Sequence, residues 1–211
     1  MPTETFPLLD GYRRFREGAY APQKRRWEQL AQGQSPPVMI IGCCDSRVDP
    51  TMIFDCGPGE VFVLRNVANL VPPCHEGRRL AASAAIEFAV AGLKVQHIVV
   101  LGHGSCGGIR AALSGADLGV PGKSFIDDWM SILDEATGRV RAEAERHPTL
   151  DMQRALEHEA IRVSLTNLRS FPFVREAEAA GQLKLSGAFF AIHDGVLHLL
   201  DEPSGKFSPA E

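Results

Sequence analysis

The stretches PVMIIGCCDSR, residues 37–47, and QHIVVLGHGSC, residues 96–106, decide the fold of this chain. Each begins with a short apolar run that does not alternate with polar residues, which is the pattern of a strand buried on both faces of a parallel sheet. Each then changes to residue types that bind metals or carry charge. Because the carboxyl ends of parallel strands form the crevice where ligands bind, we expect the two polar clusters to lie together.

The rest of the chain predicts an α/β fold with a mostly parallel central sheet flanked by helices. At 9–32, apolar residues recur at helical spacing among charged ones, which predicts an N-terminal helical arm. The other expected strands lie at 60–64, 183–190 and 196–200, the last two joined by an Asp-Gly turn. The other expected helices lie at 78–93, which is poor in charge, at 107–113, and through most of 124–180.

Composition and charge exclude several classes of protein. A formal charge of −4 and a pI near 6.0 argue against a nucleic-acid surface. A hydrophobic share of 45% without a run of about 18 apolar residues argues against a membrane span. The N-terminal residues lack the layout of a secretory signal, so we expect a cytoplasmic protein. Its five cysteines, an odd number, then indicate metal binding or catalysis rather than disulfides.

Three residues of the two clusters are the types that zinc prefers. Cys43 follows the first strand, and His103 and Cys106 follow the second. Thiolate and imidazole ligands suit tetrahedral zinc, and a catalytic site keeps one position for water or substrate. Taken singly, each cluster is better read as buried thiols or a satisfied histidine. Their joint occurrence after two buried strands favours a zinc site.

These motifs resemble those of a known enzyme family. Cys-x-Asp-Ser-Arg at 43–47, Arg-Asn-x-Ala-Asn at 65–69 and Gly-His-x-x-Cys-Gly-Gly at 102–108 are similar to the signature of beta-class carbonic anhydrases. The likeness is strong over residues 30–113 and much weaker beyond them. It implies a lyase, carbonate dehydratase, that converts carbon dioxide to bicarbonate and a proton by attack of zinc-bound hydroxide.

The resemblance also implies an organisation and an assembly. We expect a single domain over 1–211, with a helical dimerisation arm at 1–33, the zinc-site core at 37–113, and helices and C-terminal strands at 124–211. The basic unit of the family is a dimer, so a homodimer, a tetramer or another dimer-based oligomer is expected, and the 78–93 helix is a candidate for packing against another subunit.

Asp45 and Arg47 are the catalytic pair that the resemblance implies. The carboxylate accepts the proton of the zinc-bound water or hydroxide while the guanidinium holds the carboxylate. If Arg47 released Asp45, the carboxylate would become the fourth zinc ligand of a closed state.

The resemblance maps a substrate pocket onto Gln34, Phe62, Val67 and Phe88. It also implies that Gln34 and Phe88 reach the pocket from the neighbouring subunit. The alternative that the three apolar residues are ordinary core stays open. Backbone N–H groups at Gly107, the start of a predicted helix, are placed to hold the anionic product.

Two other functions remain open from the residues. Relatives of this fold hydrolyse carbon disulfide or carbonyl sulfide with the same metal site. A non-catalytic zinc or thiol protein is a further alternative, although a structural site has no need for the Asp45–Arg47 pair.

The ligand set generates a prediction about pH. Two thiolates cancel the charge of Zn²⁺, which makes the metal a weaker Lewis acid than one held by three neutral imidazoles. We therefore expect the rate of carbon dioxide hydration to rise toward alkaline pH, as measured by stopped-flow assay across the pH range. A rate that stays flat from acid to alkaline pH would contradict this expectation.

Overall fold

The computed structural model describes residues 7–75, 80–115 and 124–210. The chain divides into two compact units, Met1–Ser35 and Pro36–Glu211. None of the helices in the described ranges combines the length and apolar content needed to cross a membrane.

The first unit is helical, as predicted for residues 9–32. Helix α1 (Leu9–Arg14) continues through a π-helical segment (Phe15–Tyr20) and a 3₁₀ turn (Ala21–Gln23) into α2 (Lys24–Leu30). The described helical residues of this unit include none that is buried, and its aromatic rings pack mainly on one another. Tyr12 is 52% exposed. The unit therefore has apolar side chains but no core of its own.

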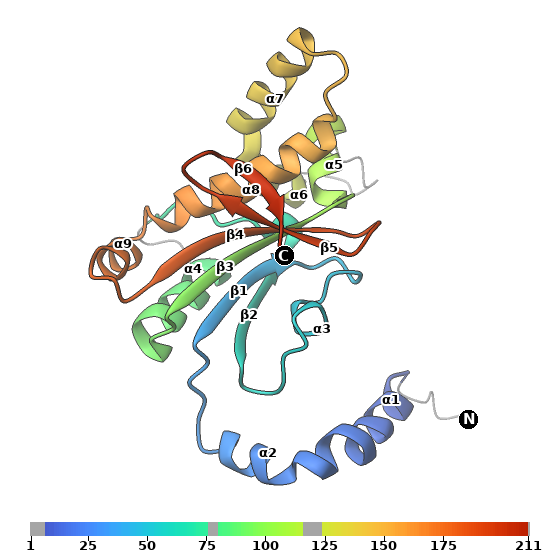
Figure 1. Ribbon diagram of the computed structural model, residues 1–211, viewed down its shortest axis with the longest axis vertical. Coiled ribbons are helices and arrows are strands. Elements are labelled where there is room, and N and C mark those ends of the chain that lie inside the picture. Colours follow the sequence, from blue (N-terminus) through green and yellow to red (C-terminus); the bar gives the residue numbers. More distant parts are fainter. Residues whose placement is uncertain (1–6, 76–79, 116–123, 211) are drawn as a thin grey trace. The chain divides into compact units, whose positions relative to one another are not determined.

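The second unit is built on one six-stranded sheet. Its strand order is β2-β1-β3-β4-β5-β6, with parallel pairing from β2 to β4 and antiparallel pairing from β4 to β6 (Figure 1). This confirms the mostly parallel α/β fold. The strands are β1 (Val38–Cys43), β2 (Val61–Asn66), β3 (His97–His103), β4 (Lys184–Ala191), β5 (Val196–Asp201) and β6 (Lys206–Pro209).

The helices of the second unit follow the predicted ranges, with one addition. Residues 78 and 79 of the predicted 78–93 helix lie outside the described residues. The helices are α3 (Pro50–Ile53), α4 (Ala81–Glu87) with a π-helical continuation (Phe88–Leu93), α5 (Gly107–Ser114), α6 (Phe125–Met130), α7 (Asp134–Arg146), α8 (Met152–Leu168) and α9 (Pro172–Ala179). Short 3₁₀ turns lie at Val67–Asn69 and Ser131–Leu133.

Two elements were missing from the sequence-based prediction. Helix α3 is a single turn, which Asp49 starts by accepting hydrogen bonds from the backbone N–H groups of Thr51 and Met52. Strand β6 is four residues long and largely exposed, and it completes a sheet edge through backbone pairing with β5. Neither element has the apolar periodicity on which sequence-based assignment depends.

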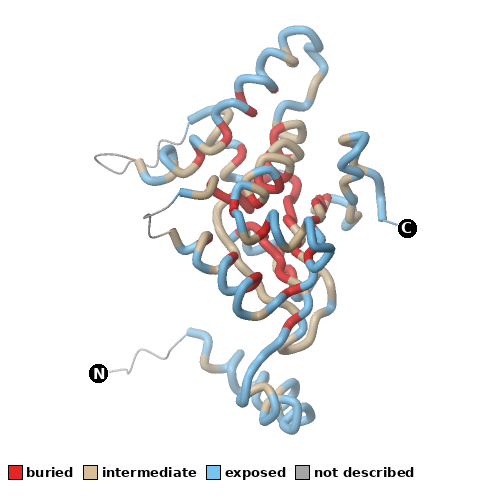
Figure 2. The backbone as a smooth tube through the Cα atoms, turned by 90° about the vertical axis from the view of Figure 1, so that its left-hand side faces the viewer, coloured by how far each residue is buried: buried red, intermediate tan, exposed pale blue. Residues whose placement is uncertain are grey.

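Both faces of β1 and β3 are covered, as their unalternating apolar runs predict. On one face, Met39 and Ile98 join a core cluster with Ile161 of α8. On the other face, Ile40 and Leu101 form a smaller cluster. Figure 2 shows buried residues concentrated in the middle of the second unit, whereas the first unit is mostly exposed.

Glycines let α8 approach the sheet closely. A Cβ atom at Gly102 of β3 would lie 2.7 Å from Ile161 Cδ1, and one at Gly187 of β4 would lie 2.7 Å from Ile161 Cγ2. Side chains at these positions would push α8 away from the sheet, so the glycines set the distance between α8 and the carboxyl end of β3.

We expect Gly187→Ala to lower the free energy of unfolding by about 1–3 kcal/mol, because the added methyl group overpacks the contact between β4 and α8. Gly138→Ala is the matched control, since a Cβ at this exposed position of α7 meets open space. It should instead raise the free energy of unfolding by up to about 1 kcal/mol. Urea unfolding measures both values, and equal stability of the two variants would contradict the close packing.

Candidate metal site

The three predicted metal ligands lie together at the carboxyl end of the sheet. Cys43 is the last residue of β1 and His103 is the last residue of β3, and these strands are parallel neighbours. Cys106 follows three residues later as the N-cap of α5. The ligand atoms of the three residues all lie within 4.8 Å of one another, and all three side chains are buried.

His103 is oriented as a metal ligand. Its Nδ1 lies 2.9 Å from the carbonyl oxygen of Gly104, so Nδ1 carries the proton and donates it. Its Nε2 is buried and has no hydrogen-bond partner among the described residues. Buried polar atoms are nearly always partnered. An unpaired lone pair on one nitrogen, with the other fixed by a carbonyl, is the arrangement of a histidine that binds a metal.

The two sulfur atoms have the spacing that zinc requires. Cys43 Sγ and Cys106 Sγ are 4.0 Å apart. Two sulfurs at tetrahedral positions of one zinc ion, each about 2.3 Å from it, are separated by about 3.8 Å. Together with His103 Nε2, the donor set therefore fits tetrahedral zinc and supplies three of its four positions.

The thiols of Cys43 and Cys106 lie within hydrogen-bond distance of each other, with their sulfur atoms 4.0 Å apart. The hydrogen bond from Cys106 lowers the pKa of the Cys43 thiol, and the same interaction raises the pKa of Cys106. Cysteine binds zinc as the thiolate, so metal binding at this site is coupled to the release of thiol protons.

Asp45 and Arg47 form a bidentate ion pair beside the ligands. Arg47 Nε donates to Asp45 Oδ1 at 2.9 Å, and Arg47 Nη2 donates to Asp45 Oδ2 at 2.6 Å. These hydrogen bonds hold the pKa of the Asp45 carboxyl well below its usual range. Arg47 Nη2 also donates to the carbonyl oxygen of Ser105, between two of the predicted ligands, at 3.1 Å. One guanidinium thus links the two motifs.

Residues 38–197 match the family model described as Carbonic anhydrase. The chain belongs to the carbonic anhydrase family. It is 35% identical to Beta carbonic anhydrase 3 of Arabidopsis thaliana, over 96% of this chain and 79% of that protein. Its fold matches the beta-carbonic anhydrase CcaA with a TM-score of 0.88 at 29% identity, covering 97% of this chain and 91% of the other. A tetrameric beta-carbonic anhydrase from Sordaria macrospora matches with a TM-score of 0.71 at 34% identity, and the match covers 92% of this chain and 91% of that chain.

The beta-class resemblance of the sequence motifs is thereby confirmed, and with it the reaction and the metal. The chain is a carbonate dehydratase of the beta class, whose reaction is the reversible hydration of carbon dioxide and whose metal is zinc. The cluster of Cys43, His103 and Cys106 is the group of side chains that fits this metal.

Arg65 is a site residue whose role the sequence does not reveal. In this carbonic anhydrase its Nε donates to the carbonyl oxygen of Cys43 at 2.8 Å, and its Nη2 donates to that of Asp45 at 2.7 Å. Its Nη1 donates to Asp49 Oδ2 at 2.8 Å. Arg65 lies in the RNVAN motif, but only the parallel register, which sets it opposite Gly42, reveals what it holds. It fixes the loop between Cys43, the first predicted zinc ligand, and α3.

The predicted substrate residues fall into two groups within one chain. Val67 packs in the same apolar cluster as the two ligand cysteines, and Gly107 is the first residue of α5, where a Cβ would meet open space. Phe62 and Phe88 instead contact each other, with ring centroids 5.9 Å apart, and Phe88 is 53% exposed. Gln34 is exposed and belongs to the first unit. The substrate assignments remain predictions.

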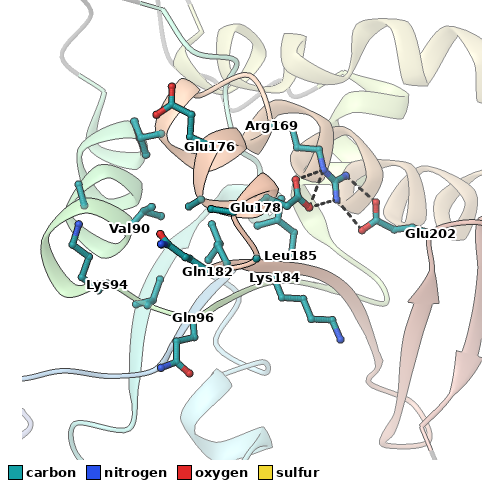
Figure 3. Close-up of a pocket in the computed structure, with 17 residues that line it drawn as sticks. Val90, Lys94, Gln96, Arg169, Glu176, Glu178, Gln182, Lys184, Leu185 and Glu202 are labelled. Carbon is teal, nitrogen blue, oxygen red and sulfur yellow. Dashed lines mark hydrogen bonds and ion pairs between the residues drawn. The ribbon is translucent and has the colours of Figure 1, made fainter.

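A large hollow of the carbonic anhydrase lies away from these ligands. Its volume is about 1250 Å³, and Gln96 and Lys184 line it where β3 and β4 begin (Figure 3). Arg169 borders it, clamped between the carboxylates of Glu178 and Glu202. The hollow is therefore at the amino ends of the parallel strands, whereas the predicted ligands are at the carboxyl ends.

We expect Cys43→Ser to lower zinc affinity by more than the roughly 100-fold that loss of an outer hydrogen-bond partner costs, because it removes a direct ligand. Cys44→Ser is the matched control, since Cys44 is the adjacent cysteine but is exposed. It should retain stoichiometric zinc by metal analysis after dialysis. Equal zinc content in both variants would contradict the ligand assignment.

Proposed function

We propose that Cys43, His103 and Cys106 hold the catalytic zinc. Asp45, restrained by Arg47, accepts a hydrogen bond from the attacking nucleophile. The observation that carries this proposal is the unpaired, buried Nε2 of His103 beside two buried thiols whose sulfur atoms are 4.0 Å apart. Bound zinc would supply Lewis acidity, which lowers the pKa of a bound water and makes a hydroxide nucleophile available.

The hydrogen bonds that Asp45 accepts leave its carboxylate one further lone pair to offer as an acceptor. Its Oδ1 accepts two, from the backbone N–H and the Nε of Arg47, whereas its Oδ2 accepts one, from Arg47 Nη2. Each carboxylate oxygen can accept two hydrogen bonds, so Oδ2 keeps one lone pair among the described residues. Because the carboxyl stays ionised, Oδ2 can only accept. It therefore selects a nucleophile that carries a hydrogen and orients its oxygen toward the carbon of carbon dioxide.

Arg47 restrains Asp45 in this role. Its two donors occupy both carboxylate oxygens, a geometry that a single point charge does not impose. These bonds hold the carboxylate against Arg47, so it cannot turn away without breaking them. Release of Asp45 by Arg47 would free both oxygens for the fourth zinc position, so the pair acts as a gate for a closed state.

We assign the substrate pocket to residues from two subunits of a homodimer. Val67 supplies an apolar wall next to the ligands, and Gly107 N–H is placed for the anionic product. Phe62 supplies further apolar surface, and Gln34 and Phe88 would come from the neighbouring subunit. The ring of Phe88 is 53% exposed, so it is accessible to a partner at that surface.

The helical arm and the assembly follow from the same reasoning. Residues 1–33 would form a dimerisation arm, supported by the exposed apolar side chains Leu8, Tyr12 and Phe15 in a unit with no core. Dimers would be the basic unit of any larger assembly, and the Sordaria macrospora relative is described as tetrameric. A cytoplasmic location is supported by the ligand thiols, which must stay reduced to bind zinc.

We expect Asp45→Asn to keep its zinc and lose about 10²–10⁴-fold in the rate of carbon dioxide hydration, because an amide that donates toward the nucleophile replaces an acceptor. Stopped-flow assays of protein with measured zinc content test this. Asp55→Asn is the control, since Asp55 is exposed and its left-handed backbone, φ 48°, accepts asparagine. Full activity of zinc-loaded Asp45→Asn would overturn the assigned role.

A further inference from the structure

We infer that Glu157, together with Gln153, is a positioning residue that fixes the backbone of Cys106 so that its sulfur faces the metal. This inference rests on the proposed function, because it takes Cys106 as a zinc ligand. Neither side chain belongs to the sequence motifs.

Two side chains of α8 hold both backbone polar groups of Cys106. Glu157 Oε1 accepts the Cys106 N–H at 3.0 Å. Gln153 Nε2 donates to the Cys106 carbonyl oxygen at 3.0 Å and to Glu157 Oε1 at 2.7 Å. The three bonds close a ring around one peptide segment. Because Gln153 and Glu157 are four residues apart, they lie on the same face of the helix.

The segment that carries Cys106 needs such support. Ser105, just before it, has a left-handed backbone with φ 57°, which is unfavourable for a residue with a side chain. Cys106 is the N-cap of α5, so its N–H lies outside the hydrogen bonds of that helix. Without Glu157, the N–H of a buried residue would lose its partner, and the turn would lose a constraint on the direction of the sulfur.

The burial of the Glu157 carboxylate is unfavourable for folding, which indicates that the side chain has a role other than stability. The residue is 2% exposed, and its nearest cation, Arg154 Nε, is 3.7 Å from Oε2. An apolar residue of similar size would pack there without the desolvation of a carboxylate. A buried charge that bonds to the backbone of a predicted metal ligand is typical of the outer hydrogen-bond partners that orient ligands in metal sites.

Zinc affinity of the full-length protein, measured by competition with a chromophoric chelator, tests the inference. Glu157→Leu should weaken zinc binding by about 10–100-fold. Glu157→Gln should stay within about 3-fold of the unsubstituted protein, because the amide oxygen still accepts both hydrogen bonds. The visible spectrum of the cobalt(II)-loaded protein should change in Glu157→Leu and not in Glu157→Gln.

Glu178→Leu is the matched control for a general loss of stability. It removes a carboxylate that pairs with Arg169 near the amino ends of the strands. It should lower the unfolding temperature of the metal-free protein while leaving zinc affinity unchanged. If Glu178→Leu weakens zinc binding as much as Glu157→Leu, or if folded Glu157→Leu binds zinc normally, the inference is wrong.

Gln153→Leu decides the question if Glu157→Leu does not fold. It removes two bonds of the ring from a partly buried position and should weaken zinc binding in the same direction by a smaller factor. Normal zinc affinity in this variant would overturn the inference. Zinc binding that survives Cys43→Ser would instead defeat the proposed function itself, so the two failures are distinguishable.

Discussion

The parallel pairing of β1 with β3 is the constraint on which the rest of the site depends. In this register Gly42 lies opposite Leu101, so both strands end at the same edge and deliver Cys43 and His103 together. Gly102 of β3 also helps to place the site, because its lack of a side chain lets α8 pack closely on β3. The packing of the sheet and helix therefore determines where the three predicted ligands lie.

Two arginine side chains hold the backbone around these predicted ligands. Arg47 neutralises Asp45 and reaches Ser105, while Arg65 holds the carbonyl groups on either side of Cys44. The guanidinium groups act as fixed hydrogen-bond donors. They therefore determine which oxygen atoms of the Asp45 carboxylate can still accept a hydrogen bond.

The strands and the candidate ligands can be predicted from the sequence because both depend on local patterns. Unalternating apolar runs indicate β1 and β3, and cysteine and histidine at their ends indicate a metal site, which remains a prediction. Contacts across long separations are not encoded in this way: Arg65 lies 22 positions from Cys43, and Glu157 lies 51 from Cys106. Strand β6 was also missed, because four largely exposed residues that pair through their backbone carry no apolar pattern.

The most direct test of the site is a crystal structure of the zinc-loaded protein at a pH where it is active. We expect zinc bonded to Cys43 Sγ and Cys106 Sγ at about 2.3 Å and to His103 Nε2 at about 2.0 Å. The carboxylate of Asp45 should remain on Arg47, as it is here. Zinc bound elsewhere, or an Asp45 oxygen in the fourth position of the active protein, would contradict this assignment.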